Sequence, residues 1–166
     1  RPRAFSRPGP TRLEAIPLAE LLPAAAAPFR MRAEQAGVEL MLSPAPEGIV
    51  MADRPQVEVV IRNLLSNAFD AVAVRPAGSR EVRLSAEAEG PDRVCIKVED
   101  SGPGLSGTAA ARLFEPFSST KSSGLGLGLA ISRAIAEAHG GSLRAEVGGH
   151  GVFRLQLPFE RKASND

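Results

Sequence analysis

The segment DRPQVEVVIRNLLSNAFDAVAV, residues 53–74, predicts the central helix of the fold. Its apolar residues recur at steps of three and four, which is the spacing of one helical face; they are Val57, Val60, Ile61, Leu64, Leu65, Ala68 and Val72. Asp53 is a suitable N-cap, and Pro55 is tolerated in the first turn because the first N–H groups of a helix have no partner. We therefore expect a helix from residue 54 to about Val74 that packs against a core.

Three polar residues of this segment lie on one face of the expected helix: Asn63, Asn67 and Asp70. Spacings of four and three place their side chains one above another, beside the apolar face. Their oxygens suit a hard cation such as Mg²⁺, which takes one or two protein oxygens and completes its shell with water and phosphate. Asn side chains that cap neighbouring loops would give the same pattern, so the helix alone leaves both interpretations open.

The rest of the chain alternates between helical and strand patterns. Residues 18–36 have helical spacing, with Pro23 and Pro28 expected to kink or shorten the helix, and residues 127–138 predict another helix. Alternating residues predict strands at 38–42, 48–51, 81–87, 93–99, 142–147 and 152–157. Short connections join several strand pairs, so we expect a mainly antiparallel sheet with helices on one face, an α+β two-layer sandwich.

Length and charge limit the possible functions. The chain has 166 residues, enough for one domain, with 20 Lys and Arg against 19 Asp and Glu. A net charge of +1 argues against nucleic-acid binding through bulk charge, and no apolar run has the roughly 20 residues of a membrane helix. The single cysteine, Cys95, excludes an internal disulfide and a multi-cysteine zinc site, and we expect it to be a buried small hydrophobe.

The two ends of the chain lack periodicity. Residues 1–17 are typical of a linker or of the end of an upstream segment, and residues 160–166 of a polar tail. The sequence therefore predicts that the folded domain covers residues 18–159.

A second polar motif, DSGPG at residues 100–104, directly follows a predicted strand. A carboxylate at a strand end can accept a hydrogen bond from an exocyclic amine, and Gly102 and Gly104 let the backbone approach a flat ring closely. The same residues are also typical of a simple turn. Taken alone, this motif is a weak signal.

A third motif, GLGLG at residues 124–128, opens a helix after the loop SSTKSS. Bare N–H groups at a helix N-terminus favour phosphate, and Lys121 adds a positive charge just upstream. Leu129 and Ile131 stand where a dinucleotide-binding fingerprint would need glycine, and the chain contains no P-loop pattern. A flexible hinge loop is the competing interpretation of the glycines.

Together, the motifs resemble the ATP-binding catalytic domain of bacterial sensor histidine kinases, in the GHKL superfamily with gyrase, Hsp90 and MutL. NLLSNAFDAV (63–72) resembles the asparagine box, DSGPGL (100–105) the first glycine box, LFEPFSSTK (113–121) the phenylalanine box and GLGLGLAISRAIAEAHGG (124–141) the second glycine box. The Thr-Lys pair and the EAHGG ending are most similar to the nitrogen-regulation, oxygen-sensing and dicarboxylate-sensing kinases. The resemblance covers about residues 18–158 and implies the Bergerat fold, with a mixed, mainly antiparallel sheet.

The resemblance also implies a Mg-ATP site. Asn67 would ligate Mg²⁺, Asn63 would assist at the phosphates, Asp70 would belong to the same site and Asp100 would hold the adenine amino group. Gly102 and Gly104 would shape the adenine pocket and form the first hinge of a lid.

That lid would comprise residues 105–123, ordered by nucleotide, with Phe114 and Phe117 holding it in place. Lys121 would reach the γ-phosphate and, with Asn63, would be catalytic. The other residues implied at the phosphates are Thr120, Gly124, Leu125, Gly126, Leu127 and Gly128.

Two departures from the wider superfamily matter. Members that hydrolyse ATP have a Glu four residues before the Mg²⁺ Asn as a general base, whereas this chain has Asn63, whose amide cannot accept a proton. Transfer to a neutral imidazole needs little base assistance, so phosphoryl transfer is favoured over hydrolysis. The last hairpin has Val152 where the family often has Thr, so the polar contact of that Thr is in question.

The phosphoacceptor His of this family lies on an upstream helical hairpin, and neither His139 nor His150 matches it. His139 is expected to cap the last carbonyls of its helix, and His150 lies in a turn. The resemblance implies two partners, the His-bearing dimerisation domain of the same parent kinase and the receiver domain of a response regulator, and no nucleic acid. It implies a cytoplasmic location without direct membrane contact from this segment, whether or not the parent is anchored in a membrane. A nucleotide-binding regulatory module of the same fold, with little or no transferase activity, is the alternative.

Overall fold

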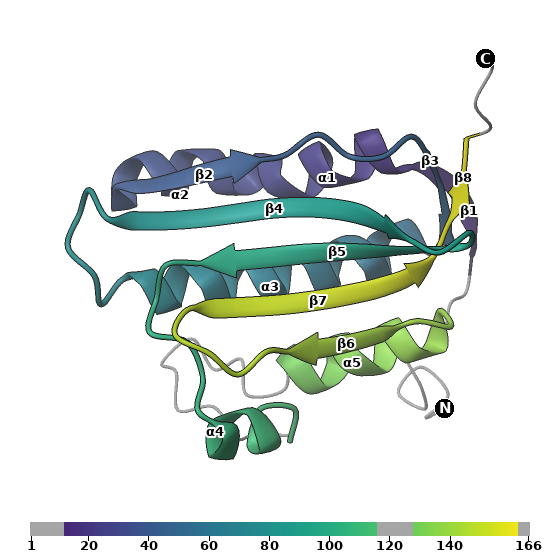
Figure 1. The fold of residues 1–166 in the computed structure, drawn as a ribbon. Helices are drawn as coiled ribbons and strands as arrows, with labels where there is room; N and C mark the ends of the chain where they lie inside the picture. The colour runs from purple at the N-terminus through teal and green to yellow at the C-terminus, as the bar shows by residue number, and fades with distance from the viewer. Residues whose placement is uncertain (1–11, 116–127, 163–166) are drawn as a thin grey trace, which may run out of the picture.

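The computed structural model describes residues 12–115 and 128–162, which form a sheet covered by helices on one face (Figure 1). The main sheet has five strands in the order β2 (Val38–Leu42), β4 (Arg80–Glu89), β5 (Arg93–Asp100), β7 (Gly151–Pro158) and β6 (Ser142–Ala145). Strands β2 and β4 are parallel, and every other neighbouring pair of this sheet is antiparallel. The predicted two-layer α/β sandwich with a mixed, mainly antiparallel sheet is confirmed.

The helix layer consists of three segments that pack on the same face of the sheet (Figure 1). The first is broken into α1 (Leu18–Ala26), the 3₁₀ turn η2 (Ala27–Phe29) and α2 (Arg30–Ala36). Pro23 is accommodated inside α1, whereas Pro28 lies in the 3₁₀ turn where the helix is interrupted, as its missing N–H predicts. The other two segments are α3 (Arg54–Val72) and α5 (Gly128–Ala138).

Helix α3 lies across the centre of the sheet and carries most of the predicted core. All seven apolar residues predicted for its buried face are buried, and so is Phe69, which lies outside the predicted pattern. Asp53 caps the helix by accepting a hydrogen bond from the N–H of Gln56 at 3.3 Å. The helix ends at Val72 rather than at Val74, whose side chain is exposed.

A second, three-stranded sheet corrects the expectation for both chain ends. It has the order β1 (Glu14–Pro17), β3 (Gly48–Ala52) and β8 (Glu160–Arg161), with antiparallel pairing throughout. Residues 1–17 were expected to be a linker without a strand, but Glu14–Pro17 form β1. The expected polar tail begins at residue 160 with two residues that pair with β3. Such short strands show almost no alternation, and the pairing of Ile16, fully buried, opposite Val50 exists only in the folded chain.

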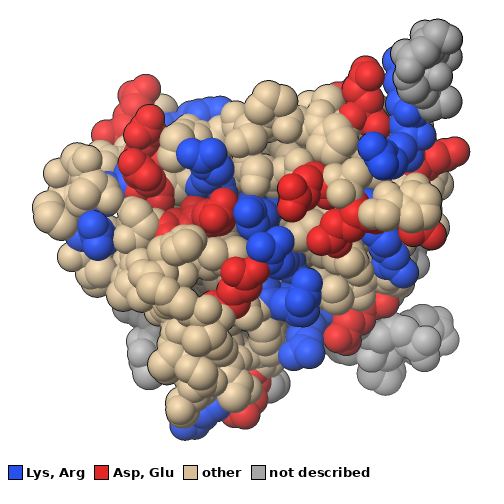
Figure 2. Space-filling model, viewed as in Figure 1, with Lys and Arg blue, Asp and Glu red and all other residues tan. Residues whose placement is uncertain are grey.

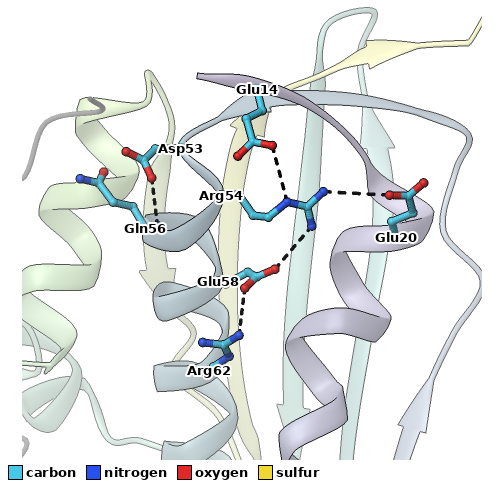
Figure 3. A network of polar contacts seen from close by, with 7 residues as sticks. All are labelled: Glu14, Glu20, Asp53, Arg54, Gln56, Glu58 and Arg62. Carbon is cyan, nitrogen blue, oxygen red and sulfur yellow. Dashed lines mark hydrogen bonds and ion pairs between the residues drawn. The ribbon is translucent and has the colours of Figure 1, made fainter. Parts of the chain in front are cut away.

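An ion network fastens β1 and α1 to the start of α3 (Figure 3). The Arg54 guanidinium lies 3.8 Å from a carboxylate oxygen of Glu14, 4.0 Å from one of Glu20 and 3.5 Å from one of Glu58. Glu58 also accepts a hydrogen bond from Arg62 at 2.9 Å. The Arg54 guanidinium thus connects side chains of β1, α1 and α3, and links the N-terminal strand to the central helix.

The open face of the sheet, opposite the helices, carries interleaved acidic and basic side chains (Figure 2). Beneath them Cys95 is buried, as predicted, and burial raises the pKa of its thiol. Arg154 lies over this thiol and hydrogen-bonds Glu146, which lowers the pKa of that carboxyl group.

Among residues 12–115 and 128–162, none of the helices combines the length and the apolar character that crossing a membrane requires.

Candidate functional site

A cavity of about 310 Å³ opens between the C-terminal half of α3, the end of β5, the start of β7 and the start of α5. Its polar side chains come from Asn67, Asp70 and Asp100, and its described lining is completed by Ala71, Pro103, Gly104, Leu105, Leu113, Leu129, Gly151 and Phe153. A mostly apolar cavity with a few convergent polar groups is typical of a small-molecule site. The residues of the first two polar motifs thus meet in one place, although more than 30 positions separate Asn67 from Asp100.

Asp100 lies at the end of β5 and is only 6% exposed. Its Oδ1 accepts a hydrogen bond from the N–H of Gly102 at 2.8 Å, which fixes the orientation of the carboxylate. A Cβ on Gly102 would lie 2.8 Å from the Ala71 carbonyl oxygen, so α3 and the loop after β5 touch through backbone at this point. Because Gly102 has no side chain, the Asp100 carboxylate and the Ala71 carbonyl of α3 can both lie close to it on one side of the cavity.

Two further glycines allow close approaches at the cavity, one of them to this carboxylate. Gly151 pairs with Asp100 across β5 and β7, and a Cβ there would lie 2.1 Å from Asp100 Oδ2. Gly104 has a φ of +80°, and a Cβ there would lie 2.1 Å from the carbonyl oxygen of Gly148. Gly151 is a site residue that the sequence analysis missed, because its role depends on the register between two strands.

Asp70 lies on the wall formed by α3, where it pairs with a residue that the sequence did not single out. Arg32 of α2 donates to Asp70 Oδ1 at 3.2 Å, and its guanidinium carbon lies 5.1 Å from the centre of the Phe69 ring. Arg32 and Asp70 are 38 residues apart, so no local spacing indicates the pair.

Asn63 points away from the lining toward α5. Its Nδ2 donates to Ser132 Oγ at 3.0 Å and lies 3.4 Å from the carbonyl oxygen of Gly128. Ser132 is fully buried, so the amide joins the central helix to the first turns of α5. Asn63 therefore holds Gly128 in place, and a role at phosphates remains a prediction.

Seven of the predicted site residues lie outside the described part of the chain: Phe117, Thr120, Lys121, Gly124, Leu125, Gly126 and Leu127. Of the expected lid, the structure describes residues 105–115, which include the short helix α4 (Gly107–Arg112) with Ser106 as its N-cap. Phe114 packs against the core, and its ring centre lies 4.9 Å from the Arg133 guanidinium carbon. Val152 is buried, and the residues on either side of it line the cavity.

Comparison with known proteins identifies the family of the chain. A family model for histidine kinase-, DNA gyrase B- and HSP90-like ATPases matches residues 52–161. The chain belongs to this family.

Individual members of the family include sensor kinases. The chain is 35% identical over 161 residues to the sensor protein FixL of Bradyrhizobium diazoefficiens, covering 95% of this chain and 32% of FixL. The catalytic domain of the histidine kinase ThkA has a TM-score of 0.78 at 26% identity, covering 89% of this chain and 96% of that domain. A crystal structure of ThkA with the response regulator protein TrrA matches with a TM-score of 0.74 at 26% identity, covering 88% of this chain and 41% of that chain. The chain thus spans about a third of the length of FixL and closely matches an isolated catalytic domain.

The donor set of this ATPase-family domain fits a magnesium ion. Asn67 offers an amide oxygen on the α3 wall of the cavity. Mg²⁺ bound with a nucleotide takes only one or two such protein oxygens, because phosphates and waters supply the others.

His139 gives the ATPase-family domain a rigid connection between α5 and α3. Its Nε2 accepts from the Asp53 N–H at 3.1 Å, so Nδ1 carries the proton and donates to the Ile135 carbonyl oxygen at 2.8 Å. The predicted contact with the last carbonyls of α5 is confirmed, and the bond to Asp53 adds a link to the N-cap of α3. His150 has a side chain 57% exposed and lies 3.5 Å from Glu99.

We expect the substitution His139→Ala to lower the free energy of unfolding by about 2 kcal/mol, because it removes two hydrogen bonds of a buried ring and takes away the side-chain acceptor of the Asp53 N–H. The matched substitution His150→Ala should change it by less than about 0.5 kcal/mol, since that side chain is exposed. Urea unfolding followed by circular dichroism measures both values. Equal effects of the two substitutions would contradict the structural role of His139.

Proposed function

We propose that this domain binds Mg-ATP in the cavity between α3 and β5 and delivers the γ-phosphoryl group to a His on the dimerisation domain of the same parent kinase. The observation that carries the proposal is the convergence of Asn67, Asp70 and Asp100 on one largely apolar cavity. The match to histidine kinase catalytic domains supports the reaction class.

The adenine ring would occupy the end of the cavity at Asp100. Adenine presents an amino group that donates hydrogen bonds, and the buried carboxylate is an acceptor already oriented by Gly102. Apolar side chains of Leu105, Leu129 and Phe153 line the same cavity and offer contacts to a flat ring. Guanine carries an acceptor oxygen in place of that amine, so we expect the site to prefer ATP over GTP.

The triphosphate would extend along α3 toward the start of α5. From Ala71, which abuts Gly102, the helix leads through Asn67 to Asn63, which contacts Gly128. Asn67 would hold the magnesium ion, which supplies charge neutralisation for the phosphates when bound. The N-terminus of α5 begins at Gly128, and unpaired N–H groups at such a position favour anions.

The residue types favour transfer to imidazole over hydrolysis. In the transfer step, the neutral imidazole nitrogen forms a bond to the γ-phosphorus while the bond from that phosphorus to the bridging oxygen breaks, and ADP leaves with the electron pair. Activation of water would need a base at the position of Asn63, whose amide donates to Ser132 and cannot accept a proton at neutral pH. Positioning and charge stabilisation are the main requirements of the transfer.

The parent protein would pass the phosphoryl group on to a response regulator. The support for this is the ThkA–TrrA complex, whose kinase chain has the same fold over 88% of this chain. The length of FixL beyond the matched region leaves room for the sensory and dimerisation parts that such a protein needs.

Mixing the purified domain with the separate His-bearing domain of its parent and γ-labelled ATP tests the proposal. We expect acid-labile label on that domain, and none when its His is replaced by Gln. ATP binding without label transfer would instead support the regulatory module, and release of free phosphate at a high rate would support hydrolysis.

A further inference from the structure

The charge of the cavity lining is a problem for a polyphosphate ligand. Of the described residues that line the cavity, two are charged, and both are acids: Asp70 and Asp100. Asp100 lies at the adenine end, where an acid has a partner in the amino group. Asp70 lies beyond it along α3, where an uncompensated carboxylate would repel phosphate oxygens.

Arg32 compensates this charge from a different part of the chain. Its Nη2 lies 3.2 Å from Asp70 Oδ1, and both side chains are partly exposed. The guanidinium also lies over the face of Phe69, whose own ring lies 5.4 Å from Phe29. Phe69 is 3% exposed, so the surface that supports the guanidinium is part of the rigid core.

This arrangement fixes the guanidinium without using all of its donors. Arginine carries five N–H groups in a planar fork that suits phosphate oxygens. The pairing with Asp70 Oδ1 uses the Nη2 nitrogen, and the Arg32 side chain is 44% exposed. The cation is therefore held against Asp70, a residue of the cavity lining, and remains partly exposed to solvent.

The position of the pair along α3 indicates which phosphate it would meet. Asp70 is adjacent to Ala71, whose carbonyl abuts Gly102 and the Asp100 carboxylate. Asn63, about two turns away, contacts Gly128 at the far end. A nucleotide with its base at Asp100 and its γ-phosphate toward Gly128 would therefore bring its α-phosphate near Asp70.

We infer that Arg32, contributed by α2 and paired with Asp70, is a nucleotide-binding residue that contacts the α-phosphate. The inference rests on the proposed function of the cavity and adds to it a residue outside all of the nucleotide-binding motifs. It also makes the broken helix α1–η2–α2 part of the site rather than only a cover for the sheet.

Calorimetric titration of the variant Arg32→Gln with adenosine, AMP, ADP and ATP, in the presence of Mg²⁺, tests the inference. We expect about a tenfold loss of affinity for all three nucleotides, the effect of one charge-assisted hydrogen bond, and unchanged affinity for adenosine. Arg32→Lys keeps the charge but not the fork, so its loss should be intermediate. The matched control is Arg30→Gln on the same helix. The Arg30 guanidinium donates to the Leu40 carbonyl oxygen, so its loss should leave the affinity for all four ligands unchanged.

Each alternative outcome is distinct. An equal loss for adenosine and ATP would reduce Arg32 to a structural link between α2 and α3, and a loss confined to ATP would contradict the α-phosphate contact. Unchanged affinity for every ligand would remove Arg32 from the site. In all three cases the unmutated domain still binds ATP, whereas absence of any adenine-nucleotide binding by that domain would overturn the proposed function itself.

Discussion

Replacement of Asp100 by Asn is expected to lower the affinity of the domain for ATP about a hundredfold. The buried Asn amide N–H group would face the adenine amino group, and two donors cannot hydrogen-bond each other. The Oδ1 position is committed to the N–H of Gly102, so the oxygen of an Asn side chain would occupy it. The Asn amide nitrogen would then lie where the Asp100 carboxylate would accept a hydrogen bond from the adenine amino group. The preference for ATP over GTP should disappear at the same time.

Calorimetric titration with ATP and GTP measures both effects. Glu99→Gln is the matched control, since Glu99 precedes Asp100 on β5 and its side chain lies on the opposite face of the sheet. That variant loses the same charge and should bind ATP as the unmutated domain does. A similar loss in both variants would mean that Asp100 acts through overall charge, and equal binding of ATP and GTP by the unmutated domain would contradict the adenine pocket.

Replacement of Asn67 by Ala should remove the contribution of Mg²⁺ to ATP binding, a loss of more than about tenfold, since the metal takes only one or two protein oxygens. Asn67 is half-buried beside the apolar face of α3 and lines the cavity, whereas the core contacts of that helix come from its apolar residues. The fold should therefore survive the substitution.

Titrations with Mg²⁺ and with a chelator separate the metal from the nucleotide. We expect the affinity of the Ala variant to be the same under both conditions, while Asn67→Asp, which keeps an oxygen ligand, should remain responsive to Mg²⁺. Ser66→Ala, the neighbouring position outside the cavity lining, serves as the control for helix effects. An undiminished response to Mg²⁺ in Asn67→Ala would exclude Asn67 as the ligand.

Local patterns were sufficient for much of the site. The spacing of Asn67 and Asp70 follows from the helical period, and the position of Asp100 follows from the end of an alternating strand, so both walls of the cavity were predictable. The helix interruption at Pro28 and the cap at Asp53 were predictable for the same reason, because each depends on neighbouring residues only.

Pairings across the chain were not predictable in this way. The strand at Glu14–Pro17 depends on β3, and the hydrogen bond from Asn63 to Ser132 depends on how α3 meets α5. The contribution of Gly151 depends on the register of β5 against β7. None of these contacts leaves a periodic signal in the sequence, because the partners are far apart along the chain.

The sequence by itself determined the main helices, the five strands of the main sheet, the family, and the residue types that could hold a metal ion and a purine. Only the tertiary structure decided that the acids of α3 and β5 share one cavity, that Gly151 leaves room for Asp100, and that Arg32 neutralises Asp70. The physical reason is range: secondary structure follows from side-chain periodicity within about ten residues, whereas a binding site is assembled by packing between distant segments.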